Sequence, residues 1–116
     1  MQSIDPGHQG PTELNSTTSV EICAAPASGK RRQVIGIHTT NLDTATGTAI
    51  LEMDVSGTKS EVDRVAIPPG ATDSSMATRD RPIHLAATTH SLTMKLSGAV
   101  AATQPKVNVE FLESTD

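Results

Sequence analysis

Four histidines are the residues of this sequence with the clearest capacity for chemistry: His8, His38, His84 and His90. Two histidines on neighbouring strands, together with a carboxylate, would form a plausible zinc site. His84 and His90 flank one short turn, but the sequence contains no HxH or HxxxH spacing, and no cysteine or carboxylate stands beside them at ligand spacing. We therefore predict ordinary polar-face histidines, with no bound metal and no cofactor.

Residue types of a hydrolase triad are also present, in His90, Ser91 and Asp80. Triads are defined by geometry rather than by the presence of these common residues, and no nucleophile-elbow sequence accompanies them. The dipeptide Gly29-Lys30 resembles the end of a phosphate-binding loop, but the glycine required five residues earlier is missing, and no serine or threonine follows. The sequence therefore predicts a protein that is not an enzyme.

The composition predicts a small hydrophobic core. The chain has 116 residues, which is the length of one domain. Phe111 is its only aromatic residue, and alanine supplies much of the 35% hydrophobic fraction. Because aromatic side chains contribute the largest buried areas, we expect part of the stability to come from a partner or from further copies of the chain. The single cysteine, Cys23, excludes an intrachain disulfide and is expected to be a small buried hydrophobe.

Charge and hydropathy argue against two classes of partner. The formal net charge is -4 and the pI is near 5.4, whereas a nucleic-acid binder needs basic surface to displace counterions. Residues 1–7 contain neither the basic nor the apolar region of a signal peptide. No apolar run approaches the ~20 residues of a membrane span. We predict that neither nucleic acid nor a membrane is a partner.

The stretch 32–55 is predicted to be a β-hairpin around which the rest of the chain is organised. Its second arm, 48–55, alternates between apolar and polar residues, which is typical of a half-buried strand. The first arm, 33–40, is rich in β-branched residues. Between them, the loop 41–47 is rich in turn-forming residues and ends in Gly47.

Other short strands are expected at regular spacing, with turn signals between them: 19–24, 58–67, 82–86, 90–97 and 106–113. The charged segment 58–67 has the character of an edge strand. In the last two strands, alternate apolar residues are expected to face the core: Leu92, Met94, Leu96, Val107, Val109 and Phe111. This pattern predicts an all-β protein with a single small antiparallel β-sandwich or jelly-roll-like domain.

Residues 1–16 are predicted to form an extended N-terminal arm, and residues 17–116 the β-sandwich domain. The arm is polar and contains Pro6, Gly7, Gly10 and Pro11, so it cannot bury enough apolar surface to order itself. We expect it to be free in isolation or held on a partner. The most concentrated positive charge follows at 30–32 and could contact an acidic protein surface. The predicted partner-binding residues are Lys30, Arg31, Arg32, Ile4, Pro6 and Pro11.

The order of these features resembles the small all-β accessory virion proteins of tailed bacteriophages, particularly capsid decoration (cement) proteins. The resemblance covers about residues 30–113. It is carried by the basic strand Lys30-Arg31-Arg32-Gln33-Val34-Ile35-Gly36-Ile37, the alternating Ala49-Ile50-Leu51-Glu52-Met53, the Ile67-Pro68-Pro69-Gly70 stop and the closing Val107-Asn108-Val109-Glu110-Phe111. It implies a homotrimer made in the host cytoplasm and bound to the major capsid protein on the outer capsid surface. It implies no catalytic residues.

Three alternatives remain open. A head-fibre, neck or tail accessory protein of a phage would show the same strand pattern. A receptor- or glycan-binding module is a second hypothesis, although the near-absence of aromatic residues disfavours it. A metal-dependent enzyme on a cupin-like barrel is a third, and it would have to use His38, His84 and His90 as ligands.

Overall fold

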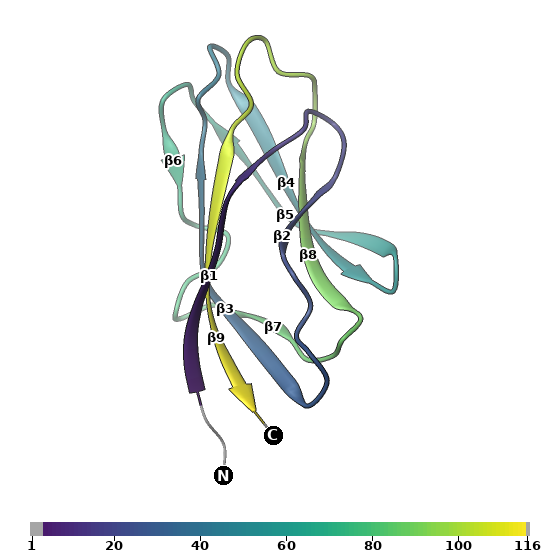
Figure 1. Ribbon diagram of the computed structural model, residues 1–116. Coiled ribbons are helices and arrows are strands. Elements are labelled where there is room, and N and C mark those ends of the chain that lie inside the picture. The colour runs from purple at the N-terminus through teal and green to yellow at the C-terminus, as the bar shows by residue number, and fades with distance from the viewer. Residues whose placement is uncertain (1–3, 116) are drawn as a thin grey trace.

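The computed structural model describes residues 4–115, and all regular secondary structure in that range is β-strand (Figure 1). The strands are β1 Ile4–Glu13, β2 Val20–Cys23, β3 Lys30–Thr40, β4 Gly47–Val55, β5 Thr58–Ile67, β6 Thr72–Asp73, β7 Ile83–Leu85, β8 His90–Leu96 and β9 Lys106–Thr115. Over the same residues there is no helix long and apolar enough to cross a membrane. The predicted all-β class is confirmed.

The strands form two antiparallel sheets that pack face to face. One sheet has the order β1-β9-β3-β6, with β7 also paired to β3, and the other has the order β2-β8-β4-β5. The antiparallel pairs β4–β5, β3–β6/β7, β2–β8 and β1–β9 are nested around the turn between β4 and β5, as if one long hairpin had been rolled up. This arrangement is a jelly roll, which confirms the predicted fold.

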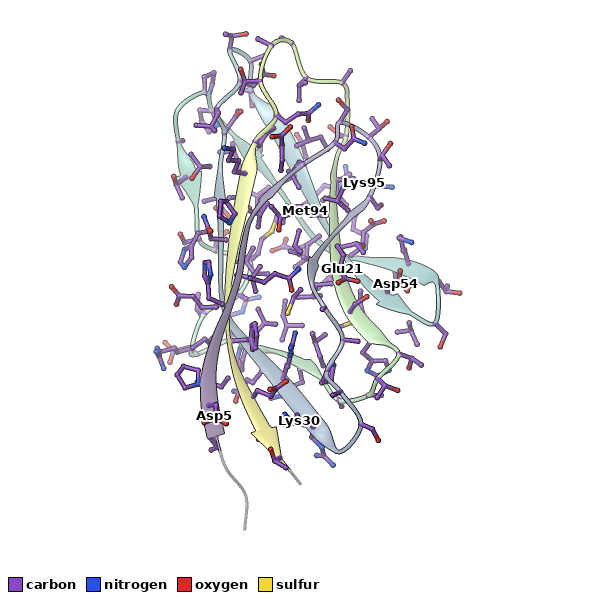
Figure 2. All side chains as sticks on the ribbon, in the orientation of Figure 1. Asp5, Glu21, Lys30, Asp54, Met94 and Lys95 are labelled. Atoms are coloured by element: carbon purple, nitrogen blue, oxygen red, sulfur yellow. The ribbon has the colours of Figure 1, made fainter. Side chains whose placement is uncertain are left out.

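The core lies between the two sheets and is built from the residues that alternate inward. All six residues predicted to face it from β8 and β9 are buried: Leu92, Met94, Leu96, Val107, Val109 and Phe111. Figure 2 shows Met94 between the sheets, where its sulfur accepts a hydrogen bond from the Thr39 hydroxyl. β5 is an edge strand, as its charges predicted.

The prediction that 33–40 and 48–55 pair as a hairpin is wrong. β3 belongs to one sheet and pairs with β9, β6 and β7, whereas β4 belongs to the other sheet and pairs with β5 and β8. The loop 41–46 therefore crosses from one sheet to the other. Alternation shows that each strand has a buried face, but it does not show which strand lies beside it.

Residues 4–13, expected to be free or held on a partner, lie in β1 along β9 of the same chain. None of the ten residues of β1 is buried, which is why the composition looked unable to order itself. An edge strand is held by main-chain hydrogen bonds and needs few apolar side chains. The division of the chain at residue 16 into an arm and a domain stays a prediction.

Candidate functional site

The outer face of the β1-β9-β3-β7 sheet carries a shallow hollow near the two ends of the described chain. Strand register places Ile4, Ser114 and Arg31 in one row across β1, β9 and β3. A second row, with Leu112 at its centre, runs from β1 to β7. We call this hollow the end hollow; it has a volume of about 200 Å³ and is lined by Ile4, Arg31, Arg32, Gln33, His84, Leu112 and Ser114.

The end hollow combines apolar surface with positive charge. Ile4 is 65% exposed, the largest exposure among the large hydrophobic side chains of the described residues. Arg31 stands in the outer-face row, and none of the lining residues is a carboxylate, although the whole chain has a net charge of -4. Lys30 lies close by, at the same end of the molecule as Asp5 (Figure 2). Such a surface suits an aliphatic side chain flanked by acidic groups.

Arg32 differs from its neighbours in the 30–32 cluster because it is held inside the domain. Its Nε donates to Glu113 Oε1 at 3.1 Å, and its Nη1 donates to the carbonyl of Ala24 at 2.8 Å. The guanidinium carbon lies 4.3 Å from the centre of the Phe111 ring, a cation–π contact. Lys30 Nζ also reaches Glu113, at 3.8 Å. Glu113 therefore neutralises part of the cluster.

The two prolines predicted as partner contacts occupy different places on β1. Pro6 pairs with Leu112 and extends the outer face that carries the end hollow. Pro11 follows the cis Gly10–Pro11 peptide, where the register of β1 on β9 shifts. The structure thus brings Ile4, Arg31 and Arg32 together in one hollow and places Pro6 beside it. Pro11 is not among the residues that line the hollow.

The histidines do not converge. His84 lies in β7 and pairs with Gln33 in one sheet, whereas His90 lies in β8 and pairs with Val55 in the other. His38 makes contacts elsewhere: Nδ1 is 2.8 Å from the Ser74 hydroxyl, and Nε2 is 3.6 Å from Glu110. Across residues 4–115, no group of three histidine, cysteine, aspartate or glutamate side chains could hold a metal ion. The three-histidine alternative therefore gains no support.

Cys23 is buried and unpaired, as expected of a small hydrophobe. Burial raises the pKa of its thiol, although the nearby Arg32 guanidinium acts in the opposite direction. His90 and Ser91 are consecutive residues of β8, so their side chains leave opposite faces of the sheet. The triad types therefore give no candidate catalytic set.

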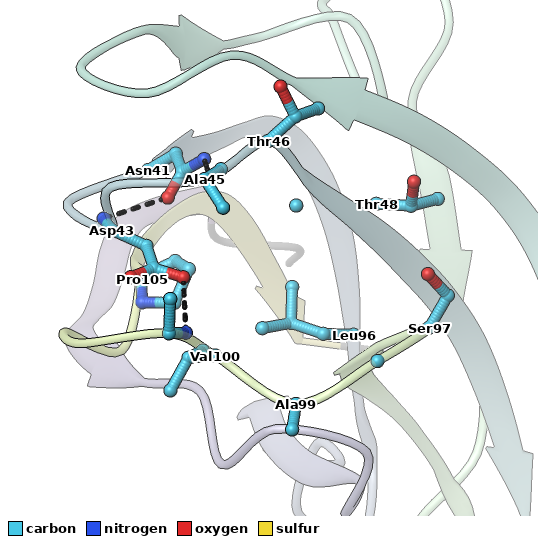
Figure 3. A pocket seen from close by; sticks show the side chains of 13 residues that line it. Asn41, Asp43, Ala45, Thr46, Thr48, Leu96, Ser97, Ala99, Val100 and Pro105 are labelled. Atoms are coloured by element: carbon cyan, nitrogen blue, oxygen red, sulfur yellow. Dashed lines mark hydrogen bonds between the residues drawn. The ribbon is translucent and has the colours of Figure 1, made fainter.

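A second site, which sequence reasoning missed, lies at the opposite end of the molecule (Figure 1) and is drawn from close by in Figure 3. The Asp43 carboxylate accepts hydrogen bonds from the main-chain N–H groups of Ala101 at 2.9 Å, Ala102 at 2.8 Å and Thr103 at 3.2 Å. It also accepts one from Thr44 at 2.8 Å. These donors, led by that of Ala101, lower the pKa of Asp43 to about 2. Asp43 thus holds the 97–105 loop against the loop that follows β3.

Asn41 completes this clamp from the end of β3. Its side-chain amide donates to the carbonyls of Ile67 and Ala45, at 2.8 and 2.9 Å, and its Oδ1 accepts from the N–H of Asp43 at 2.9 Å. The hollow that Asn41 and Asp43 help to line has a volume of only about 140 Å³. Because its polar groups are already satisfied within the chain, we assign this site to structure rather than to ligand binding. In the sequence, Asn41 and Asp43 stand out only as turn-forming residues of the loop 41–47, which predicts a turn but not a clamp.

Hollow volumes over the described residues also argue against a small-molecule site. Four of them have volumes of about 140, 290, 260 and 200 Å³, at or below the low end of ligand pockets, roughly 300 Å³.

Comparison with known proteins does not assign a family. No protein-family model and no curated protein matches the chain. Similar solved structures include a subunit from the Bacillus endospore appendages described as disulfide-linked pili (14% identity, TM-score 0.48, 99% of this chain and 87% of that one). Others are the Tobacco streak virus coat protein (11%, 0.49, 99% and 85%) and a chain of the cyanophage Pam1 capsid (15%, 0.38, 99% and 85%). At these TM-scores none of the likenesses assigns a function.

Proposed function

We propose that this chain is a structural virion protein of a tailed bacteriophage, a decoration (cement) protein that binds the outer surface of the major capsid lattice and stabilises the head. The observation that carries the proposal is the end hollow. It places Ile4, the most exposed large apolar side chain of residues 4–115, beside Arg31 on an otherwise acidic protein. A surface contact of this kind, without an enclosed pocket, suits a lattice partner.

Lattice binding also accounts for the small core. A partner that binds only the folded domain stabilises it by mass action. Many symmetric copies make a modest contact effective through avidity. We further propose a homotrimer, which would present three end hollows to a threefold position of the capsid. Light scattering of the purified protein tests the trimer directly: we expect a mass of three 12.1 kDa chains, and a monomer at every concentration would contradict it.

The decisive experiment is binding to purified capsids of the same phage that were assembled without this protein. Deleting residues 1–16 would be a poor test, because it removes β1 and the buried Leu14 and so disturbs folding. Single substitutions in the end hollow are better. We expect Ile4→Ser and Arg31→Glu each to weaken capsid binding by about tenfold or more, with a steeper salt dependence for the wild type than for Arg31→Glu.

Lys59→Glu provides the matched control, since it makes the same change in net charge in the β4–β5 hairpin, away from the end hollow. It should leave capsid occupancy unchanged. If the wild type binds capsids but both end-hollow variants bind equally well, the contact surface is wrong. If the wild type fails to bind capsids and instead binds necks or tails, the head location is wrong and the accessory-protein alternative takes its place.

A further inference from the structure

β1 is attached to the rest of the domain in an unusual way for a strand of a small protein. It pairs with β9 along nearly its whole length, from Ile4 opposite Ser114 to Glu13 opposite Lys106. Yet none of its residues is buried, so the core between the sheets does not depend on its side chains. Its attachment rests on main-chain hydrogen bonds and a few local contacts.

Those local contacts reach β9 and the end of β2. Gln9 Oε1 accepts a hydrogen bond from the N–H of Ala24 at 2.8 Å, and His8 Nε2 lies 3.2 Å from Asn108 Oδ1. Gly7 packs so closely on Phe111 that a Cβ atom at this position would overlap the ring. The groove beside β9 thus requires an extended segment with glycine opposite Phe111, and the β1 sequence supplies that glycine.

β1 contains a natural hinge near its C-terminal end. The ladder with β9 is interrupted at Gly10-Pro11, between the pairs made by Gln9 and Thr12. Immediately afterwards Leu14 is buried, and its N–H donates to the Pro105 carbonyl at 2.9 Å. The segment 4–9 can therefore leave β9 while Leu14 stays anchored in its own domain.

We propose that residues 4–9 of β1 are exchanged between copies of this chain, so that this segment of one copy occupies the β9 groove of another. The exchanged and closed forms make the same contacts within the ladder and differ mainly in the conformation of the hinge. The ratio between the two forms therefore depends on protein concentration. The occupant is a second copy of this chain, because its β1 carries the glycine that Phe111 requires. This proposal does not rest on the capsid role and is tested on the purified protein alone.

The test uses single-cysteine variants in a Cys23→Ser background. His8 and Glu110 are direct cross-strand partners, and such partners have Cα atoms about 4.5–5.5 Å apart, within the range of a disulfide. His8→Cys and Glu110→Cys proteins are unfolded in urea, mixed, refolded together and oxidised. A mixed disulfide between the two chains forms readily only if β1 of one chain lies on β9 of the other.

Asp54→Cys and Lys59→Cys give the matched control mixture. They are also cross-strand partners, but a two-residue turn joins their strands, so their pairing always stays within one chain. We expect a mixed disulfide from the first mixture and none above background from the second. The ratio of exchanged to closed form should fall about tenfold for each tenfold drop in free monomer. Equal yields from the two mixtures at every concentration would overturn the proposal.

A second measurement avoids substitutions in the protein. A fluorescent peptide of residues 4–13 is refolded with an excess of the wild-type chain and separated by gel filtration. We expect the peptide to elute with the protein, and a Gly7→Val peptide to lose that binding because its side chain meets Phe111. If both peptides, or neither, elute with the protein, the β9 groove does not accept a β1 segment from outside in the way proposed.

Discussion

Gly7 of the first strand lies directly against the ring of Phe111 in the last strand. The same ring also contacts the Arg32 guanidinium, whose central carbon lies 4.3 Å from the ring centre. The only aromatic residue of the chain therefore joins β1, β9 and β3 at the end of the sheet that carries the end hollow. This small cluster gives the first prediction.

Gly7→Ala should destabilise the protein by about 1–3 kcal/mol, because a methyl group at this position forces Phe111 or β1 to move. Urea unfolding followed by circular dichroism measures the change. Gly98→Ala is the control, since an added Cβ there meets nothing within 4 Å, and its effect should stay within about 0.5 kcal/mol. Equal stabilities of the two variants would show that Phe111 does not pack against Gly7.

Two adjacent arginines should respond differently to the same conservative change. Arg32→Lys loses the stacked, forked geometry that reaches Phe111, Ala24 and Glu113, and we expect a loss of about 1–2 kcal/mol. Arg31 lies on the outer face of the sheet, so Arg31→Lys should change the free energy of unfolding by less than about 0.5 kcal/mol. Chemical denaturation compares them. A larger loss at Arg31 than at Arg32 would contradict the structural role assigned to Arg32.

Asp43 should make the stability of the protein depend on pH in the acid range. Its pKa in the folded protein is about 2, against an ordinary value of 3.8. Because the folded-state pKa is the lower one, the unfolded chain takes up the proton first as the pH falls. The stabilisation from this carboxylate is therefore complete above about pH 4 and is lost as the pH falls through about 2.

Asp43→Asn tests this, since the amide presents a donor where main-chain N–H groups converge. We expect the variant to melt several degrees below the wild type at pH 7, with the gap closing as the pH falls from about 4 to 2. Asp80→Asn, in the exposed loop between β6 and β7, is the control and should melt with the wild type. If the difference in melting temperature between Asp43→Asn and the wild type does not change with pH, the ionised Asp43 carboxylate does not stabilise the fold as described.

Cys23 should be nearly unreactive in the native protein. Its side chain is buried and its pKa is raised by that burial, so little thiolate is available to attack a reagent at neutral pH. Ellman's reagent should react slowly in buffer and fully within the mixing time in concentrated urea. Rapid reaction of the native protein would mean that the β2 region opens far more often than its burial suggests.

The class of the fold, most strand positions and the inward faces of β8 and β9 follow from the two-residue period of the sequence. Strand neighbours do not. The stretch 32–55 looks like a hairpin because its two arms are close in sequence, yet the arms lie in different sheets. In a jelly roll most pairings join segments that are far apart along the chain, and local patterns carry no information about such pairs.

The candidate site could be predicted only in part. Charge concentration pointed to the 30–32 cluster, and polar composition pointed to an arm over 1–16 that includes Ile4; the structure brings Arg31, Arg32 and Ile4 into one hollow. The partners of that hollow, Leu112 and His84, come from β9 and β7 and gave no local signal. The Asp43 clamp escaped notice because its acceptor and donors are almost 60 residues apart in the sequence, and an aspartate in a turn has many commoner explanations.

The nesting of the strand pairs also sets an order of events during synthesis. The β4–β5 hairpin can form as soon as it is made, then β6 and β7 reach β3, β8 reaches β2, and β9 reaches β1 last. The strand that leaves the ribosome first therefore waits for the strand that leaves last. At roughly 5–20 residues per second, the intervening ~100 residues take roughly 5–20 seconds to make. In a crowded polysome, that delay gives the β1 of one nascent chain time to meet the newly completed β9 of its neighbour.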